Sequence, residues 1–474
     1  MRVLNKKGDE IHILLKPEEN LRVGDCLSVG GIIVQVIDIE YPTTHGMLEH
    51  ILRKSLMEST DTEEHMQREV QSILDQLSDH KLAITKIRGR LEDGVFKPGF
   101  AELNINRSDV LIELLDPERI IDMLRLQSKH MTTEWGEIES RRPAPFPFML
   151  DKLGITLITG MKGSGKSYAA KKILLELVKM GRVVIVLDLN SEYINLWRNE
   201  KGGPNQYAGR IVVLDPKTTE ACENRVPLRI PLHEISYDDF AAFTGIDRTT
   251  QMYNELIVFW ERERSFSLDD LEEWAESIEN RYVRAGLLGK IRAARAMNLF
   301  GESDIAGLIR QMERGGGAIV VNLTGVTRKE REVIVEFVLR RITALRRNGE
   351  IKPLCLFAEE AQLYATQVMW DDVLTRMRHY GIFPVFITND PRTLPDDVFS
   401  LCDNIIAFKF QNWDDLKQIG RAKMIDLDTL NLLKNVENHR CLIIGDLTND
   451  FPLLVKATPQ SGVMMGGETQ ELFT

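Results

Sequence analysis

At 474 residues the chain is too long for one ordinary hydrophobic core, so we expect two or three domains. A formal net charge of −11 at pH 7 argues against an exposed, strongly basic nucleic-acid surface, although a ring that encloses its ligand needs only a local basic lining. The five cysteines form no C-x-x-C pair and charges interrupt every apolar run, which argues against structural zinc and membrane segments and indicates a cytoplasmic protein.

The N-terminal region alternates short apolar and polar runs that glycines interrupt, a pattern typical of strands. Such runs occur at 10–15 and 32–37 and return at 82–87 and 102–105, whereas the stretch from about 45 to 80 has the charged, periodic pattern of helices. We therefore predict a small β-barrel over residues 1–115 with a helical insertion at about 45–80. Two uses of this insertion stay open: a hairpin that packs on its own domain, or a docking surface for a partner.

Residues 116–147 are predicted to form a helix and an extended linker. The helical pattern runs from Asp116 to about Lys129. The run Arg-Arg-Pro-Ala-Pro-Phe-Pro at 141–147 follows, and its prolines fix their own φ and disfavour helix in the residue before each of them. We place a domain boundary there, which leaves 148–474 as a large second domain.

A phosphate-binding loop opens this second domain. Residues 160–167 read Gly-Met-Lys-Gly-Ser-Gly-Lys-Ser and match the pattern G-x-x-x-x-G-K-[ST], between an apolar β-branched run at 154–159 and a helical pattern at 168–180. Glycines let backbone N–H groups close on phosphates, Lys166 brings a cation to the β- and γ-phosphates, and Ser167 offers a hydroxyl to Mg²⁺. We expect the nucleotide, ATP with Mg²⁺, to be bound by Gly160, Met161, Lys162, Gly163, Ser164, Gly165, Lys166, Ser167 and Tyr168.

A second apolar run, at 183–188, ends in Asp188, and Glu192 follows four residues later. An acid at the carboxyl end of a parallel strand faces the ligand crevice, so both side chains are candidates for ordering Mg²⁺-bound water. Helix capping and a surface ion pair are an equally good account of them. Farther on, 237–314 has helical apolar spacing and predicts a helical insertion.

Paired carboxylates follow the apolar run at 354–358. One carboxylate of such a pair can hold the Mg²⁺ shell while the other orients the attacking water, so we assign Glu359 to the metal and Glu360 to the water. A further strand is predicted at 383–388 and ends in Asn389, whose amide could sense the γ-phosphate or hold the water; its other interpretation is a turn residue in Asn-Asp-Pro. Later strands are predicted at 402–410 and 441–444.

Glu-Glu-Ala-Gln at 359–362 resembles the D/E-E-A-H box of the HerA/FtsK superfamily of ring-forming ATPases, and the whole chain resembles its HerA branch. Asp188 to Tyr193 is similar to the family's D-P-H-G-E-Y, and Arg378-His-Tyr-Gly to its R-K-F/Y-G. The resemblance implies an α/β fold, with an N-terminal HAS barrel before a RecA-like motor that carries a helical insertion. It also implies a homohexamer in which Arg378 acts as an arginine finger. Three positions depart from the family pattern: Gln362 stands where the family has histidine, Asn389 where its S/T-Q-R-P has glutamine, and Asn190-Ser191 where it has His-Gly.

What the resemblance implies about function is an ATP hydrolase that translocates or unwinds double-stranded DNA. Its partners would be a NurA-like nuclease or another effector, in DNA-end processing or antiphage defence. The alternative is a nucleotide-gated hexameric scaffold that regulates an effector and pumps little DNA. Local basic clusters at 328–331 and 340–347 are candidates for the lumen, although pairing with carboxylates on solvated helix faces accounts for them equally simply.

Overall fold

The computed structural model describes ten stretches of the chain, and we confine structural statements to them. They are residues 1–41, 80–99, 110–126, 131–132, 135–140, 142–364, 376–410, 412–423, 425–433 and 436–465. The helical insertion predicted at about 45–80 lies almost entirely outside them, as does the strand predicted at 102–105. The chain forms two compact units. The first consists of Met1–Lys152, Lys409–Gly420 and Met424–Thr458, and the second of Leu153–Phe408, Arg421–Lys423 and Pro459–Thr474.

The first unit begins with an antiparallel sheet in the order β1-β2-β5-β4-β3-β7, with β6 beside β5. Its strands are β1 (Arg2–Lys7), β2 (Glu10–Leu15), β3 (Cys26–Val29), β4 (Ile32–Glu40), β5 (Lys81–Glu92), β6 (Val95–Pro98) and β7 (Ile112–Leu114). Alternation decides which face is buried: Ile11, Ile13 and Leu15 on β2 are fully buried, and the residues between them are not. The sheet fits the small barrel that the sequence predicts.

The segment between this sheet and the second unit is extended but well packed. Helix α3 (Pro117–Met123) ends earlier than the predicted 129, because Arg125 takes a positive φ of 50° that interrupts the helical backbone. The proline-rich run then contributes Phe146, which packs with Phe148 and Trp135, all three fully buried. Burial of these aromatic rings fixes a segment that composition alone predicts as a linker.

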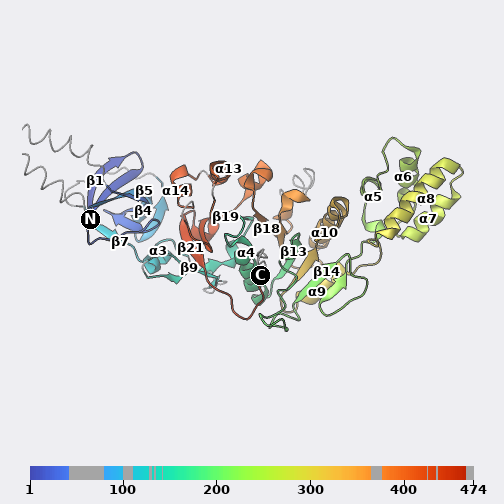
Figure 1. Ribbon diagram of the computed structural model, residues 1–474, viewed down its shortest axis with the longest axis horizontal. Coiled ribbons are helices and arrows are strands. Elements are labelled where there is room, and N and C mark those ends of the chain that lie inside the picture. The colour runs from blue at the N-terminus through green and yellow to red at the C-terminus, as the bar shows by residue number, and fades with distance from the viewer. Residues whose placement is uncertain are drawn as a thin grey trace, which may run out of the picture. The chain divides into compact units, whose positions relative to one another are not determined.

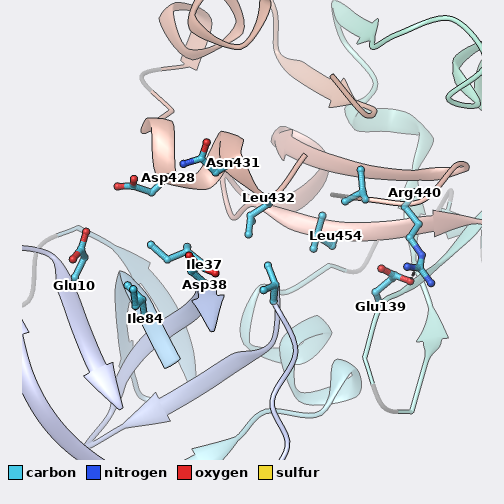
Figure 2. Close-up of a pocket in the computed structure, with 12 residues that line it drawn as sticks. Glu10, Ile37, Asp38, Ile84, Glu139, Asp428, Asn431, Leu432, Arg440 and Leu454 are labelled. Atoms are coloured by element: carbon cyan, nitrogen blue, oxygen red, sulfur yellow. Dashed lines mark ion pairs between the residues drawn. The ribbon is translucent and has the colours of Figure 1, made fainter. Parts of the chain in front are cut away.

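The rest of the first unit comes from both sides of this segment. Its strands are β8 (Met131–Thr132), β9 (Gly136–Ile138), β10 (Ala144–Pro145), β11 (Phe148–Met149), β20 (Arg440–Gly445) and β21 (Leu453–Ala457). Within the unit β10, β9, β21 and β20 are antiparallel neighbours, and β8 pairs with β11. A cavity of 430 Å³ in this unit has an apolar floor that includes Leu432 and Leu454, with Glu10, Asp38 and Asp428 around it (Figure 2). No residue of the phosphate-binding loop lines it.

A partly buried ion-pair cluster ties β5 to α14 (Leu427–Asn431) in the same unit. The Arg88 side chain is 8% exposed; its guanidinium lies 3.3 Å from Asp426 and donates to Gln35 Oε1 at 3.0 Å. Lys86, 9% exposed, lies 3.2 Å from Asp428. Two cations removed from water need these carboxylates, so the cluster couples the β-sheet to a segment more than 300 residues away in sequence.

The second unit is built on a parallel sheet in the order β19-β12-β18-β17-β13-β16-β14-β15. Its strands are β12 (Thr156–Thr159), β13 (Val183–Asp188), β14 (Ile211–Asp215), β15 (Arg225–Pro227), β16 (Gly317–Asn322), β17 (Leu354–Glu359), β18 (Ile382–Thr388) and β19 (Asn404–Ala407). Every residue of β12, β13, β16 and β17 is buried, as expected of parallel strands covered on both faces. The predicted P-loop motor fold of RecA type is thereby confirmed. Strands β14 and β15 were missed by the sequence analysis.

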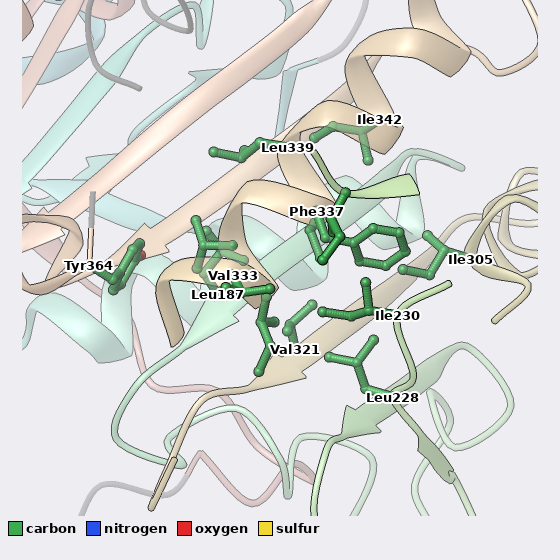
Figure 3. Packing of buried hydrophobic residues seen from close by; sticks show 14 of the residues in the cluster. Leu187, Leu228, Ile230, Ile305, Val321, Val333, Phe337, Leu339, Ile342 and Tyr364 are labelled. Carbon is green, nitrogen blue, oxygen red and sulfur yellow. The ribbon is translucent and has the colours of Figure 1, made fainter. Parts of the chain in front are cut away.

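Helices cover this sheet and extend it at one end. They include α4 (Lys166–Lys179), α5 (Tyr237–Thr244), α6 (Gln251–Arg262), α7 (Leu268–Ser277), α8 (Arg281–Ala296), α9 (Ile305–Met312), α10 (Arg328–Arg347) and α12 (Asp396–Leu401). Phe337 of α10 packs into a cluster with Leu187 of β13 and Val321 of β16 (Figure 3). The helices α5 to α8 form the predicted insertion beyond the β14 end of the sheet (Figure 1), where Phe259 contacts Phe266 at 4.8 Å between ring centroids. None of the described helices is long and apolar enough to cross a bilayer.

The ion-pair cluster of the first unit generates a stability prediction. Burial raises the pKa of Asp426, but the hydrogen bonds from Thr429 and the charges of Arg88 and Lys86 outweigh it, so this pKa lies below its ordinary 3.8. We expect Asp426→Asn, which can still cap α14, to lower the unfolding free energy by about 2 kcal/mol, less than for a fully buried pair because a third of Asp426 stays exposed.

Urea unfolding of the full chain measures this difference. Asp414→Asn is the matched control, because Asp414 is 68% exposed and pairs only with Lys417 three residues away, so its loss should change stability by less than about 0.5 kcal/mol. The Asp426 contribution should persist above pH 4 and fade as the pH falls below 3.8, where the folded carboxylate becomes protonated. Equal stability of the two variants at pH 7 would contradict the prediction.

Candidate nucleotide-binding site

The phosphate-binding loop leaves β12 and turns directly into α4. Three of its glycines have positive φ, 151° at Gly160, 79° at Gly163 and 110° at Gly165, which lies just before the helix. At Gly160 an added Cβ would come within 2.6 Å of Phe408 Cβ, so no larger residue fits there without a shift. The loop therefore has the backbone freedom that a phosphate-binding loop at a helix N-terminus needs.

The Lys166 side chain folds back over the loop. Its Nζ donates to the Met161 carbonyl at 2.8 Å, and Ser164 Oγ donates to the same carbonyl at 2.7 Å. Burial lowers the pKa of Lys166 to about 8, against the opposing effect of the Glu360, Glu192 and Glu359 charges. A buried lysine with this pKa is a cation at neutral pH, and among the described residues it forms no ion pair; a phosphate would supply the anionic partner.

Buried carboxylates gather at the same edge of the sheet. Strand register sets Leu187 beside Ala358 and Glu359 beside Ile387, so Asp188 and Glu359 end neighbouring strands. Asp188 is fully buried and Glu359 is 2% exposed. Burial raises the pKa of Glu359 to about 9, and the Glu192 and Asp188 charges add to this shift. The cluster is short of positive charge.

The residues fit the magnesium ion that the loop motif implies. Ser167 Oγ lies 3.4 Å from Glu359 Oε1, while Glu359 Oε2 is buried and has no hydrogen-bond partner among the described residues. These are oxygen ligands of the type that Mg²⁺ prefers. Within the described ranges no three acidic, histidine or cysteine side chains form a metal site by themselves, which suits an ion held jointly by one or two side chains and a nucleotide.

Glu360 stands apart from Glu359 in its surroundings. Its φ of 47° turns the chain out of β17. Its side chain accepts hydrogen bonds from Gln362 Nε2 at 2.7 Å, Thr388 Oγ1 at 3.4 Å and Asn389 Nδ2. Two of the three departures from the family pattern, Gln362 and Asn389, thus meet at one carboxylate. Asn389 is at the sheet edge, as predicted for a residue that ends its strand.

Asp188 and Glu192 are near the other acids but both have protein partners. Asp188 accepts from the backbone N–H groups of Glu192 at 3.0 Å and Tyr193 at 2.8 Å, so it caps the turn after β13. Burial raises the pKa of Asp188, against these hydrogen bonds. Glu192 pairs with Lys171 at 3.0 Å. This is not a surface ion pair, because Lys171 is 1% exposed.

Sequence analysis did not identify Lys171 or the C-terminal segment near the loop helix. Lys171 Nζ donates to the Met465 carbonyl at 2.6 Å, the Met464 N–H donates to the Arg198 carbonyl at 2.8 Å, and the Gln460 N–H donates to the Tyr168 hydroxyl. Lys171 lies four residues after Ser167, on the next turn of α4, which is the only signal in the sequence that could have indicated it.

Arg378 is not brought together with the other site residues. It lies 2.9 Å from Asp403, which also accepts the Ile155 N–H at 2.8 Å. Ile155 precedes β12 and the phosphate loop follows it, so four strand residues separate the two edges. At about 3.3 Å per residue this is about 13 Å, and Arg378 is at the far edge from the loop of its own chain.

The basic clusters have mostly protein partners. Arg328 pairs with Glu332 at 2.9 Å, Arg340 with Asp239 at 3.1 Å, and Arg341 with Glu234 at 3.5 Å. Arg346 donates to the carbonyls of Tyr380, at 2.6 Å, and Ile351. Ion pairing on helix faces therefore accounts for much of the basic character at 340–347.

Comparison with known proteins agrees with this architecture. The family described as the central domain of helicase HerA matches residues 147–342. A probable DNA double-strand break repair helicase HerA of Methanocaldococcus jannaschii is 24% identical over 377 residues, which cover 65% of this chain and 72% of that protein. The DNA double-strand break repair helicase HerA of Sulfolobus acidocaldarius is 22% identical over 346 residues, 66% of each chain. The chain thus spans about two thirds of the length of these curated relatives.

Two solved structures align with a large part of this chain at low identity. VirB4 of Thermoanaerobacter pseudethanolicus aligns at 17% identity and a TM-score of 0.49 over 69% of this chain and 97% of that one. The bacterial conjugative coupling protein TrwB aligns at 13% identity and a TM-score of 0.47 over 74% of this chain and 93% of that one. In its central region and by comparison with these curated relatives, the chain is similar to HerA-like ATPases.

Proposed function

We propose that the protein hydrolyses ATP as a homohexamer and uses the energy to move double-stranded DNA. The observation that carries the hydrolysis proposal is Glu360, a carboxylate held by three side-chain donors at the sheet edge where the phosphate loop begins. A carboxylate so fixed is suited to orient a water molecule. The boundaries 1–115, 116–147 and 148–474 for barrel, linker and motor remain part of the proposal.

Each residue of the site has a separate task in this mechanism. Lys166 exchanges the Met161 carbonyl for the β- and γ-phosphates, and loop N–H groups from Gly160 to Tyr168 hold the phosphate oxygens. Ser167 and Glu359 would hold Mg²⁺, which when bound neutralises phosphate charge. Glu360 takes the proton of the attacking water, and Asn389 fixes the Glu360 carboxylate. Asp188 and Glu192 hold the turn that faces this edge and order water there.

The assignment of Glu360 predicts a separation of binding from turnover. We expect Glu360→Gln to bind ATP with unchanged affinity but to hydrolyse it at least about 10²-fold more slowly, because the amide cannot accept a proton. Lys166→Ala should lose nucleotide affinity as well. Phosphate release and fluorescent-nucleotide binding measure the two effects, with Glu350→Gln, on a 40% exposed surface carboxylate, as the control. Parental turnover in Glu360→Gln would show that another group orients the water.

The position of Arg378 supports an active site shared between subunits. The length of β12, about 13 Å, separates the Arg378 guanidinium from the phosphate loop of its own chain, so it cannot reach phosphates bound there. At a subunit border, however, a planar cation suits the γ-phosphate of a neighbour. In this arrangement Arg378 would exchange Asp403 for phosphate.

Mixed hexamers test this arrangement. Arg378→Ala and Glu360→Gln subunits should each be inactive alone, and mixing them should restore part of the ATPase activity, because some interfaces then combine an intact arginine with an intact glutamate. Size-exclusion chromatography confirms assembly of each preparation. Full activity of Arg378→Ala by itself would exclude the finger.

The proposal that the substrate is DNA rests on the family match and on the relatives, which are described as DNA double-strand break repair helicases. We infer that the motor acts in the cytoplasm with a partner protein. This partner is a NurA-like nuclease or another effector, in DNA-end processing or antiphage defence. The alternative is a nucleotide-gated scaffold for the effector. It is supported by the arginines at 340–347, several of which pair with carboxylates or carbonyls of the protein and so are less available to DNA phosphates.

ATP turnover on two forms of DNA separates the motor from the scaffold. We expect linear duplex to raise turnover more than covalently closed circular duplex, because a ring threads a free end. Affinity should be independent of sequence and fall steeply with salt, with about 0.9 units of log–log slope for each phosphate neutralised. Turnover unaffected by either DNA, with the effector protein present, would favour the scaffold.

A further inference from the structure

Three buried oxygen atoms near the phosphate loop have no hydrogen-bond partner among the described residues. They are Glu359 Oε2, the hydroxyl of Tyr193 and the hydroxyl of Tyr364. Tyr193 is fully buried and Tyr364 is 4% exposed. Leaving a buried hydroxyl without a partner costs stability, and phenylalanine would fill the same space without that cost. Two such tyrosines beside one unpartnered carboxylate oxygen therefore require an explanation.

The two hydroxyls belong to one electrostatic neighbourhood. Burial raises the pKa of Tyr193 and of Tyr364, and for both rings the charge that adds most is that of Glu359. Backbone geometry holds both residues in place: the Tyr193 N–H donates to Asp188 at 2.8 Å, and the Tyr364 N–H donates to the Ala361 carbonyl at 3.2 Å. Lys171 Nζ lies 5.4 Å from the centre of the Tyr193 ring.

The rings themselves are well packed, which separates them from their hydroxyls. Tyr364 lies at the margin of the apolar cluster that includes Leu187 and Val333 (Figure 3). The ring thus has an ordinary structural role, and phenylalanine would serve it. A phenol adds one donor and one acceptor to the same position. Water molecules with two to four such partners are a common part of protein interiors, and the metal's outer ligands orient its inner ones.

We propose that Tyr193 and Tyr364 are positioning residues whose hydroxyls bind water around the metal and nucleotide, and thereby orient the free oxygen of Glu359. The inference rests on the proposed function and extends it to two residues outside the phosphate loop and the paired carboxylates. Tyr193 comes from the turn after β13 and Tyr364 from the end of η3 (Ala361–Leu363), so the water shell is enclosed from two elements of the sheet edge.

The test removes each hydroxyl and keeps the ring. In Tyr193→Phe and Tyr364→Phe of the full chain, Mn²⁺ affinity is measured by electron paramagnetic resonance in the presence of a non-hydrolysed ATP analogue. We expect about 10-fold weaker Mn²⁺ binding in each variant. Binding of the analogue in EDTA should stay unchanged. The melting temperature of the nucleotide-free protein should not fall, because the two hydroxyls make no hydrogen bond to any described residue.

Tyr207→Phe is the matched control. Its ring is also 2% exposed, but Tyr207 lies four residues before the start of β14, at the opposite edge of the parallel sheet from Asp188 and Glu359, so its loss should leave Mn²⁺ affinity unchanged. Unchanged Mn²⁺ affinity in both test variants would overturn the inference, as would a loss that follows a lowered melting temperature. If the parental protein binds neither metal nor nucleotide, the proposed function fails. If the parental protein binds both and the variants bind Mn²⁺ equally well, this inference alone fails.

Discussion

Removal of carboxylates from water at one edge of the parallel sheet is the constraint on which the site depends. Parallel strands must end at a common edge, and here two of them end in Asp188 and Glu359, both nearly inaccessible. Burial disfavours the charged forms of both. The charges of Glu192 and Asp188 further raise the pKa of Glu359, and the charge of Glu192 further raises the pKa of Asp188. Lys171 offsets only part of this charge. A cation bound at this edge would offset the remaining negative charge.

Strand order explains why Glu360 has hydrogen-bond donors around it that Glu359 lacks. Because β18 lies between β12 and β17, its carboxyl end brings Thr388 and Asn389 between the phosphate loop and the paired acids. Glu360 can reach these donors only because its backbone turns into the left-handed region, at a cost of about 1–3 kcal/mol for a residue with a side chain. The two neighbouring carboxylates thus have different surroundings. Glu359 has one oxygen without a hydrogen-bond partner among the described residues, whereas Glu360 is enclosed by donors.

Local sequence signals predicted the parts of this site that are contiguous in the chain. The phosphate loop, β13, β17 and β18 each combine a distinct apolar run with a polar end, and all were placed within two residues. The contacts of Lys171, Tyr364 and the Arg378–Asp403 pair depend on which strands are neighbours, and no local pattern contains that information. The helix from Asp116 was predicted too long because a single positive φ, at Arg125, leaves no periodic trace.

Two of the departures from the family pattern, Gln362 and Asn389, both concern the hydrogen bonds of Glu360. Where the resembling family has histidine and glutamine, this chain has Gln362 and Asn389, and both donate from a side-chain amide to the same carboxylate. A histidine changes its donor capacity with pH near neutrality, whereas an amide donates at every such pH. The exchange keeps a donor at each position and removes a titrating group from contact with Glu360. The orientation of this carboxylate is therefore independent of any protonation change at position 362.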